Sequence, residues 1–301
     1  MSTNFSKLNL FLELFQKIQL PNCYLSISYK NQNIFKNSII DDKINSLVYS
    51  HSLSPNYFDY LVNEENYKFN KIKQANKGFA IDMSESGSLQ AYIETNMSRS
   101  SRKTIRQSVR RLEDAFKISY RMFDSNILNT EYTILFDQLR VMLDKRFEQK
   151  NEEDEKLCEW SQIKHDFYKD LKNKKATIFV IYNSNTPIGI SLNYLINSIM
   201  FSWISSYNID YAKFSLGHVD LYKHVEWCFE NNIKIMELGY GDHNYKYKWC
   251  NTIYNFEHHI IYKKNSIKGV FLGKLEYIKI YVKEFLKQKG IVNFYKKIKN
   301  C

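Results

Sequence analysis

Glycine and proline are scarce in this chain of 301 residues, which contains only 9 Gly and 3 Pro. No Pro-, Ser- or Gly-rich segment interrupts the sequence, so a flexible tether between separate domains is not expected. Hydrophobic residues make up 44% of the chain and aromatic residues 16%, which is enough apolar material for a packed core. The length allows one large domain or two halves of ordinary size, and any two halves should be closely packed.

Cysteine is also rare, and its pattern is uninformative for pairing. The five cysteines are scattered, are odd in number and include no CxxC pair: Cys23, Cys158, Cys228, Cys250 and Cys301. This pattern fits reduced thiols in a cytosolic protein better than a disulfide framework. No HxxxH or comparable carboxylate spacing indicates a metal site, so no metal is expected.

Long uncharged apolar runs are lacking too, and the 32 acidic residues are outnumbered by 43 Lys and Arg. No apolar run approaches the roughly 18 residues of a membrane-spanning helix, and the first twenty residues carry Glu13 and Lys17 without a small-residue cleavage site, which argues against a signal peptide. The net charge of +11 favours anionic partners such as phosphates, carboxylates, nucleic acid or an acidic membrane surface. We therefore expect a soluble, cytoplasmic protein. The lysine-rich C-terminal segment leaves two interpretations open, a peripheral contact with the inner face of the membrane or a solvated helix face.

Hydrophobic periodicity predicts a mixture of helices and strands. Helices are expected at 1–20, from Ser54 and Pro55 onward, at 96–116, 132–149, 159–173, 215–232 and 243–249, and from about 270. Strands are expected within 23–50 and at 116–123, 176–182, 188–196, 199–208, 233–238 and 256–264. The three strands between 176 and 208 follow one another at short spacing and predict a β-meander.

Three of these helices have an apolar face that we expect to be buried. In the helix at 1–20 this face contains Leu8, Leu12, Phe15 and Ile18. In the helix at 96–116 it contains Ile105, Val109, Leu112 and Phe116, and in the helix from about 270 it contains Leu275, Ile278, Val282 and Phe285. The helix at 96–116 also carries a basic stripe formed by Arg102, Lys103, Arg106 and Arg110. That stripe can bind an anionic acceptor, such as a sugar nucleotide or a carrier phosphate, or it can be a solvated face.

The stretch ELGYGDHNYKYKWCN, residues 237–251, concentrates two of the scarce glycines and several polar reactive groups. It follows an almost wholly apolar segment, KIMEL, that is typical of a strand buried on both faces. If the strand at 199–208 is its parallel neighbour, the carboxyl ends of the two strands flank one cleft, where ligands bind in open α/β sheets.

The order of elements in the second half, together with residues 214–249, resembles the Gcn5-related N-acetyltransferase (GNAT) superfamily. Within it the chain is similar to the BioF2-like or cellulose-biosynthesis-type acetyltransferases, which are related to the FemABX peptidyltransferases. The motif that carries the resemblance is acid–apolar–Gly–x–Gly, then Tyr-Lys and an aromatic residue: Glu237, Gly239, Gly241, Tyr245, Lys246 and Trp249. Residues 49–61 and 98–113 also resemble segments of that branch.

The resemblance implies a mixed α/β fold of two tandem GNAT-like halves, 1–124 and 125–268, followed by a basic helix at 269–301, with the acyl donor bound in the second half. It implies an N-acyltransferase that moves an acyl group from acyl-CoA or acyl carrier protein to a small-molecule or saccharide amine, in envelope or polysaccharide assembly. The expected catalytic residues are Glu237 and His218 as bases and Tyr245 as the acid that protonates the leaving thiolate. The expected donor-binding residues are Ser206, Ser215, Gly217, Gly241 and Lys246, and the expected acceptor-binding residues are Arg102, Lys103, Arg106 and Asp242.

The residues themselves leave structural alternatives open. Glu237 can cap backbone or pair with Lys246, Asp242 can be the N-cap of the short helix, and Gly217 can simply open its helix. The segment around Gly217 has one glycine where the common GNAT phosphate loop has several. Two other functions therefore stay open: transfer from aminoacyl-tRNA, as in the FemABX relatives, and a non-catalytic module that binds polyanions or a membrane surface.

Overall fold

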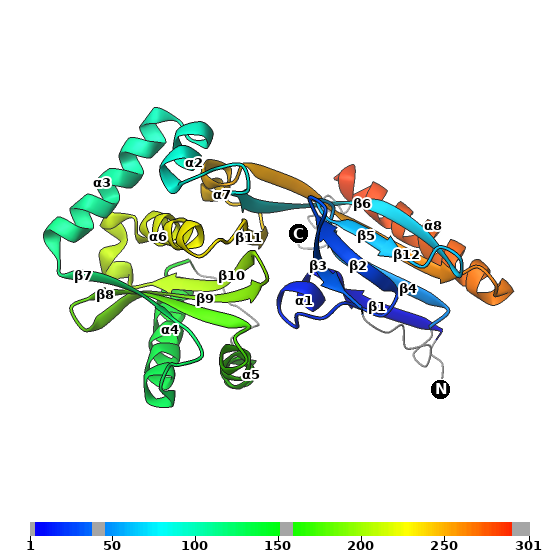
Figure 1. The fold of residues 1–301 in the computed structure, drawn as a ribbon, viewed down its shortest axis with the longest axis horizontal. Coiled ribbons are helices and arrows are strands. Elements are labelled where there is room, and N and C mark those ends of the chain that lie inside the picture. The colour runs from blue at the N-terminus through cyan, green and yellow to red at the C-terminus, as the bar shows by residue number, and fades with distance from the viewer. Residues whose placement is uncertain (1–3, 38–45, 151–158, 291–301) are drawn as a thin grey trace, which may run out of the picture. The chain divides into compact units, whose positions relative to one another are not determined.

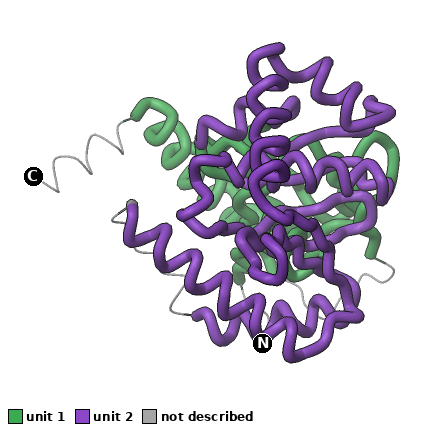
Figure 2. Tube along the Cα trace, turned by 90° about the vertical axis from the view of Figure 1, so that its left-hand side faces the viewer, with its two compact units in different colours: residues 1–79, 240–242, 253–301 green, residues 80–239, 243–252 purple. Residues whose placement is uncertain are grey.

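The computed structural model describes residues 4–37, 46–150 and 159–290. The chain divides into two compact units, which are drawn in different colours in Figure 2. Unit 1 comprises residues 1–79, 240–242 and 253–301, and unit 2 comprises residues 80–239 and 243–252. These bounds differ from the expected halves at 1–124 and 125–268, because residues 80–124 belong to unit 2 and residues 253–268 to unit 1. Each unit mixes helices with strands, so the expected mixed α/β fold is confirmed.

Unit 1 contains two sheets. In the larger, the strand order is β1-β4-β12-β6, formed by β1 (Phe5–Asn9), β4 (Val48–Pro55), β12 (Thr252–Lys263) and β6 (Tyr67–Asp82). In the smaller, the order is β3-β2-β5, formed by β3 (Gln32–Lys36), β2 (Tyr24–Tyr29) and β5 (Asp59–Val62). The described residues of unit 1 also form the helices α1 (Leu10–Phe15) and α8 (Ile267–Gln288).

Unit 2 is built on strands in the order β11-β10-β9-β8-β7: β11 (Ile235–Tyr240), β10 (Ile199–Tyr207), β9 (Thr186–Ile196), β8 (Ala176–Asn183) and β7 (Ile118–Phe123). The last four strands are antiparallel neighbours, which confirms the predicted meander and adds β7 to its edge. Figure 1 shows α3 (Arg99–Ala115) and α6 (Leu216–Glu230) on one face of these strands, and α4 (Asn129–Lys150) and α5 (Trp160–Lys172) on the other. Shorter helices within the described part of unit 2 are α2 (Leu89–Asn96), η2 (Ile209–Phe214) and α7 (Asn244–Trp249).

The core between α3, α6 and the meander follows the predicted periodicity. Ile105, Val109 and Leu112 are buried on α3, and Phe116, just after the helix, is partly buried against the same cluster. Phe179 of β8 and Val219 of α6 pack into this cluster. Full burial of one such side chain contributes about 1.5–3 kcal/mol. The fold that carries the β10–β11 strand ends is therefore anchored by a substantial apolar core.

Two helix predictions in unit 1 are wrong. In place of one helix over the first twenty residues, residues 5–15 form β1 and the short α1, whose buried residues are Leu10, Phe11, Leu14 and Phe15. The expected helix entry at Ser54 and Pro55 is the end of β4, where Pro55 is opposite Phe256 of β12. Both errors have the same cause: strand pairing outweighs a local helix signal when a neighbouring strand is available.

The prediction of which face of the last helix is buried is also wrong. Leu275, Ile278, Val282 and Phe285 were expected inside, yet they are 47–58% exposed on α8. The buried residues of α8 are Gly269, Gly273, Glu276, Ile280 and Glu284. A Cβ at Gly273 would overlap the ring of Tyr262 on β12, so the helix backbone lies directly against the sheet there. No helix within the described ranges is long and apolar enough to cross a lipid bilayer.

Candidate functional site

Unit 2 contains a pair of parallel strands whose pairing stops early. Ile199–Phe201 of β10 pair with Ile235–Glu237 of β11, and the strands then continue to Tyr207 and Tyr240. The prediction that these two strands are parallel neighbours is confirmed. Where a parallel ladder stops, the backbone N–H and C=O groups of both strands need other partners, and the carboxyl ends of such strands are where α/β sheets bind ligands.

Glu237 lies at the last paired position of β11 and is fully buried. Its Oε1 accepts a hydrogen bond from the backbone N–H of Gly239 at 2.8 Å. Gly239 has a φ of 67°, a left-handed conformation that glycine adopts at little cost. The carboxylate therefore fixes the turn at the end of β11, which is the backbone-capping alternative left open by the sequence.

Lys246 of α7 does not reach solvent, since its side chain is only 2% exposed. Its ammonium donates to the carbonyl oxygen of Leu238 at 2.8 Å. The alternative that Lys246 is a solvated lysine is thus excluded. Its ammonium, which was expected to bind the donor, is hydrogen-bonded to the end of β11. Burial, and then the nearby Glu237 charge, raises the pKa of the Cys250 thiol well above its ordinary value, whereas Lys246 lowers it. Both charged groups therefore lie near Cys250.

His218, in the first turn of α6, is joined to α7 by a hydrogen bond. The indole N–H of Trp249 donates to His218 Nδ1 at 2.9 Å. Because an indole can only donate, the neutral imidazole carries its proton on Nε2. Burial, and then the charge of Lys248, lowers the pKa of His218. The imidazole is neutral at pH 7 and its basic nitrogen already accepts a hydrogen bond, so the geometry gives His218 a positioning role.

Tyr245 is the expected catalytic residue that remains accessible, with 40% of its surface exposed. Burial and then the neighbouring Cys250 raise its pKa to about 12, with a smaller upward contribution from Asp220 and a downward one from Arg146. The phenol therefore stays protonated through the neutral range and can donate a hydrogen bond or a proton.

Arg146 was missed by the sequence analysis. It comes from α4, and its guanidinium carbon lies 5.1 Å from the centre of the Tyr207 ring at the end of β10. The charge of Arg146 also acts on Tyr245. In the sequence Arg146 is one charge among many at the end of a polar helix, so no local signal distinguishes it.

Three of the five residues expected to bind the donor, Ser206, Ser215 and Gly217, lie along the segment that leads from β10 into α6. Ser206 is buried, and its Oγ has no hydrogen-bond partner in the part of the chain that the structure describes. Ser215 precedes α6 with a φ of 56° and does not cap the helix with its side chain. Gly217 is exposed, and a Cβ built there would meet only the Tyr207 ring, at 3.9 Å. The first turn of α6 is therefore uncapped by a side chain and sterically open.

Gly241 and Asp242 are counted in unit 1, whereas the other predicted site residues belong to unit 2. Gly241 has a φ of 104°, and Asp242 is exposed. The N-cap of α7 is His243, without a side-chain hydrogen bond, so the expected N-cap at Asp242 is wrong by one residue.

A basic groove lies along α2 and α3. It has a volume of about 420 Å³ and is lined by Glu94, Arg99, Arg102, Lys103, Arg106, Gln107 and Arg110. Arg102 donates to the Glu94 carbonyl at 2.8 Å, and Arg106 donates to Gln90 Oε1 at 2.7 Å. These bonds hold two guanidinium groups over the α2–α3 junction while the groove keeps a large excess of positive charge. The predicted basic stripe is therefore a concave surface.

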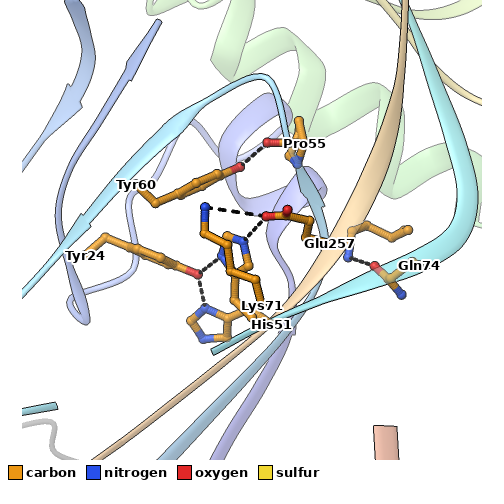
Figure 3. Close-up of polar contacts among 9 residues, drawn as sticks. Tyr24, His51, Pro55, Tyr60, Lys71, Gln74 and Glu257 are labelled. Atoms are coloured by element: carbon orange, nitrogen blue, oxygen red, sulfur yellow. Dashed lines mark hydrogen bonds and ion pairs between the residues drawn. The ribbon is translucent and has the colours of Figure 1, made fainter. Parts of the chain in front are cut away.

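Unit 1 has a polar cluster of its own, which the sequence analysis did not predict (Figure 3). The Tyr24 hydroxyl lies 2.9 Å from His259 Nδ1 and 3.1 Å from His51 Nδ1, and His259 Nε2 lies 3.2 Å from Glu257. Lys71 faces the same carboxylate at 3.6 Å. Burial lowers the pKa of both histidines, to about 3 for His51. Tyr24, His51 and His259 are buried, whereas Glu257 is partly exposed and Lys71 is exposed, so the chain of polar contacts runs from the core of unit 1 to its surface.

The interrupted parallel pair, the open start of α6 and the accessible Tyr245 belong to one mixed α/β domain, and together they form its candidate site. Residues 99–247 match the family model described as "Acetyltransferase (GNAT) domain". The matched segment, which lies within unit 2 except for residues 240–242, identifies a GNAT acetyltransferase domain in the chain, as the resemblance predicted. No curated protein sequence matches the chain.

Solved structures of similar fold include FemX, with a TM-score of 0.50 and 8% identity over 71% of this chain and 72% of FemX. Others are the L-PGS of Bacillus licheniformis, with a TM-score of 0.41 and 12% identity over 76% and 72% of the two chains, and a tandem GNAT protein from the clavulanic acid biosynthesis pathway, with a TM-score of 0.36 and 6% identity over 73% and 65%. The likeness to FemX shows a shared fold. Because it covers 71% of this chain, it extends beyond residues 99–247.

Proposed function

We propose that unit 2 transfers an acyl group from a thioester donor, acyl-CoA or acyl carrier protein, to an amine. The observation that carries this proposal is the β10–β11 pair, whose ladder ends at Phe201 and Glu237 inside the segment that matches the GNAT family. Beyond the last paired residues, backbone N–H groups that do not bond the neighbouring strand can donate hydrogen bonds to an oxyanion. Such an oxyanion forms when an amine attacks a thioester carbonyl.

The reaction needs one new C–N bond, one broken C–S bond and one proton moved. The amine nitrogen attacks the carbonyl carbon, and the sulfur leaves with the electrons of the C–S bond. The nitrogen gives its proton to solvent water, and solvent returns a proton to the group that protonates the sulfur. In our proposal the Tyr245 hydroxyl donates its proton, or a hydrogen bond, to the leaving sulfur. Its pKa of about 12 keeps the phenol protonated for that role. Glu237 and Lys246 position the end of β11, and His218 positions Trp249.

The donor is proposed to bind at the start of α6. Ser206 offers a buried hydroxyl without a partner among the described residues, and the sterically open start of α6 at Gly217 offers its backbone N–H to a phosphate, whereas the N–H of Ser215 already donates to the Ala212 carbonyl. Arg146 would add a positive charge beside the same strand end. These groups fit an anionic donor, although the site has one glycine where the common GNAT phosphate loop has several.

The basic groove on α3 is proposed to hold an anionic part of the acceptor through Arg102, Lys103 and Arg106. The same charge favours a second candidate, in which the donor is an aminoacyl-tRNA whose phosphates lie along this groove. The buried free thiols Cys23, Cys228 and Cys250 support a reducing, cytoplasmic location for either reaction.

The experiment that tests the proposal is native mass spectrometry of the full-length protein incubated with acetyl-CoA, acyl carrier protein or charged tRNA. We expect a complex with acetyl-CoA or acyl carrier protein, and release of free thiol when an amine is added. Binding of charged tRNA alone would favour the second candidate. Binding of none of the three would contradict both.

A further inference from the structure

Helix α8 of unit 1 presents two opposite faces of different chemistry. The face toward the sheet contains Gly269, Gly273, Glu276, Ile280 and Glu284, which are the buried residues of the helix. The outward face contains the large apolar side chains Ile267, Phe271, Leu275, Ile278, Tyr281, Val282 and Phe285, which are 47–93% exposed. Successive members of this outward set lie at most four residues apart, so they form one continuous stripe.

The inward face attaches α8 firmly without using the apolar stripe. Glu276 accepts a hydrogen bond from Ser50 at 2.9 Å and pairs with Lys7 at 3.0 Å. Glu284 accepts a hydrogen bond from the backbone N–H of Ala75 at 3.1 Å. Together with the close backbone contact at Gly273, these bonds fix the rotation of the helix about its axis. The apolar stripe is therefore held outward by the fold.

The stripe from Ile267 to Phe285 is about 27 Å long at the helical rise of 1.5 Å per residue. Contiguous exposed apolar surface of this size is unusual on a soluble protein and marks an interaction site. Exposed lysines lie within and beside the stripe: Lys268, Lys274, Lys279 and Lys283. An apolar stripe flanked by lysines is the pattern of a helix that lies in the plane of a lipid interface.

We propose that α8 docks on an anionic phospholipid bilayer, with its apolar stripe at the level of the acyl chains and its lysines at the headgroups. Charge complementarity favours this partner over a second copy of the chain. Two α8 helices placed face to face would bring like-charged lysines together on proteins that each carry a net charge of +11, which opposes association. This inference does not depend on the proposed acyl transfer.

The test is flotation of the full-length protein with vesicles of phosphatidylcholine containing 30% phosphatidylglycerol, beside vesicles of phosphatidylcholine alone. We expect binding to the anionic vesicles, at least tenfold weaker binding to the neutral ones, and loss of binding as salt is raised, because salt screens the lysines. The variant Phe271→Glu/Ile278→Glu should lose binding at least tenfold.

A matched control is available on α4 of unit 2. The variant Ile134→Glu/Val141→Glu places two glutamates at the same spacing on a helix, at residues that are 59% and 48% exposed, and should bind like the wild type. Circular dichroism of each variant checks that it folds. The proposal is overturned if the wild type does not float with anionic vesicles, or if the α8 and α4 variants bind equally. It is also overturned if light scattering shows a wild-type dimer that the α8 variant converts to monomer, because the stripe would then be a self-association surface.

Discussion

Each unit contains a pair of parallel strands, and the two pairs differ in how far they are joined. In unit 1, all five residues of β1, Phe5–Asn9, pair with Val48–Ser52 of β4. In unit 2, β10 and β11 pair over three residues and then continue without further pairing to each other in the described register. A closed ladder satisfies its own backbone groups, whereas an interrupted one presents them to a ligand. We therefore assign a structural role to the β1–β4 pair and propose the β10–β11 pair as the reaction site.

The polar groups beside the two pairs follow the same division. In unit 1, the Tyr24 hydroxyl is bonded to two histidines, and its ring is completely buried. In unit 2, Tyr245 keeps 40% of its surface exposed. Buried hydrogen-bonded groups specify a core, whereas an exposed phenol beside open strand ends is able to meet a substrate. The predictions below test this difference, beginning with the largest effect.

Replacing Tyr245 with Phe removes the proposed proton donor while keeping the ring. We expect turnover of thioester donor and amine to fall about 100- to 10,000-fold, the usual range for loss of a general acid. Tyr247→Phe is the matched control, because Tyr247 is on the same helix and is 44% exposed. Thiol release measures both variants. Equal rates for the two would remove Tyr245 from the mechanism.

Replacing Lys246 with Met leaves the Leu238 carbonyl without the ammonium that now donates to it. We expect the free energy of unfolding to fall by about 1–3 kcal/mol, the cost of a buried acceptor left unpaired. Lys248→Met, at an exposed position of the same helix, should change it by less than about 0.5 kcal/mol. Urea titration distinguishes them, and a stable Lys246 variant would mean that the end of β11 is held by other groups.

The histidine cluster of unit 1 predicts sensitivity to acid. The pKa of His51 is lowered from near 6.5 to about 3, chiefly by burial, so the unfolded chain takes up this proton before the folded chain does. Stability that is present above pH 6.5 is therefore lost as the pH falls toward 3, by about 1.4 kcal/mol per pH unit, or about 2 kcal/mol by pH 5.

Calorimetry between pH 7.5 and 5 measures this loss in the wild type and in His51→Gln, which should show a smaller decline of Tm. The exposed His165 of α5 provides the control, since His165→Gln should decline as the wild type does. Parallel curves for His51→Gln and the wild type would show that His51 does not govern the acid response.

Substitution of Gly217 is expected to have the smallest effect on the free energy of unfolding. The position has room for a Cβ, so Gly217→Ala should raise the free energy of unfolding by about 0.4–1 kcal/mol, because alanine restricts the unfolded chain. If the donor approaches the backbone there, the same variant should bind acetyl-CoA more weakly. Thermal melts with and without acetyl-CoA measure both effects. A variant that is more stable and binds equally well would remove Gly217 from the donor site.

Much of unit 2 could be predicted because its signals are local. The α3 residues Ile105, Val109 and Leu112 repeat at helical spacing, and the short turns of the meander separate its strands clearly. The buried character of β11 could be predicted from its apolar sequence, and its parallel pairing with β10, which the sequence left as a condition, is present in the structure. Lys246 could not be placed, because its burial depends on the path of the backbone around Gly239.

The fold of unit 1 was harder to predict because its strands pair with strands that are distant in sequence. β6 was missed, since lysines and asparagines along Tyr67–Asp82 obscure its alternation. The wrong face of α8 was predicted to be buried. Hydrophobic periodicity locates the apolar face of a helix, and on α8 that face points outward. Two glycines and two hydrogen-bonded glutamates form the packing face instead, and sequence periodicity gives such residues no weight.

Hydrogen exchange with and without acetyl-CoA tests the contrast between the two parallel pairs most directly. The account predicts that donor binding slows amide exchange in the unpaired end of β10, up to Tyr207, and in the first turn of α6, while Val48–Pro55 of β4 exchanges at an unchanged rate. Slower exchange confined to β1 and β4, or no change in either unit at saturating acetyl-CoA, would contradict it.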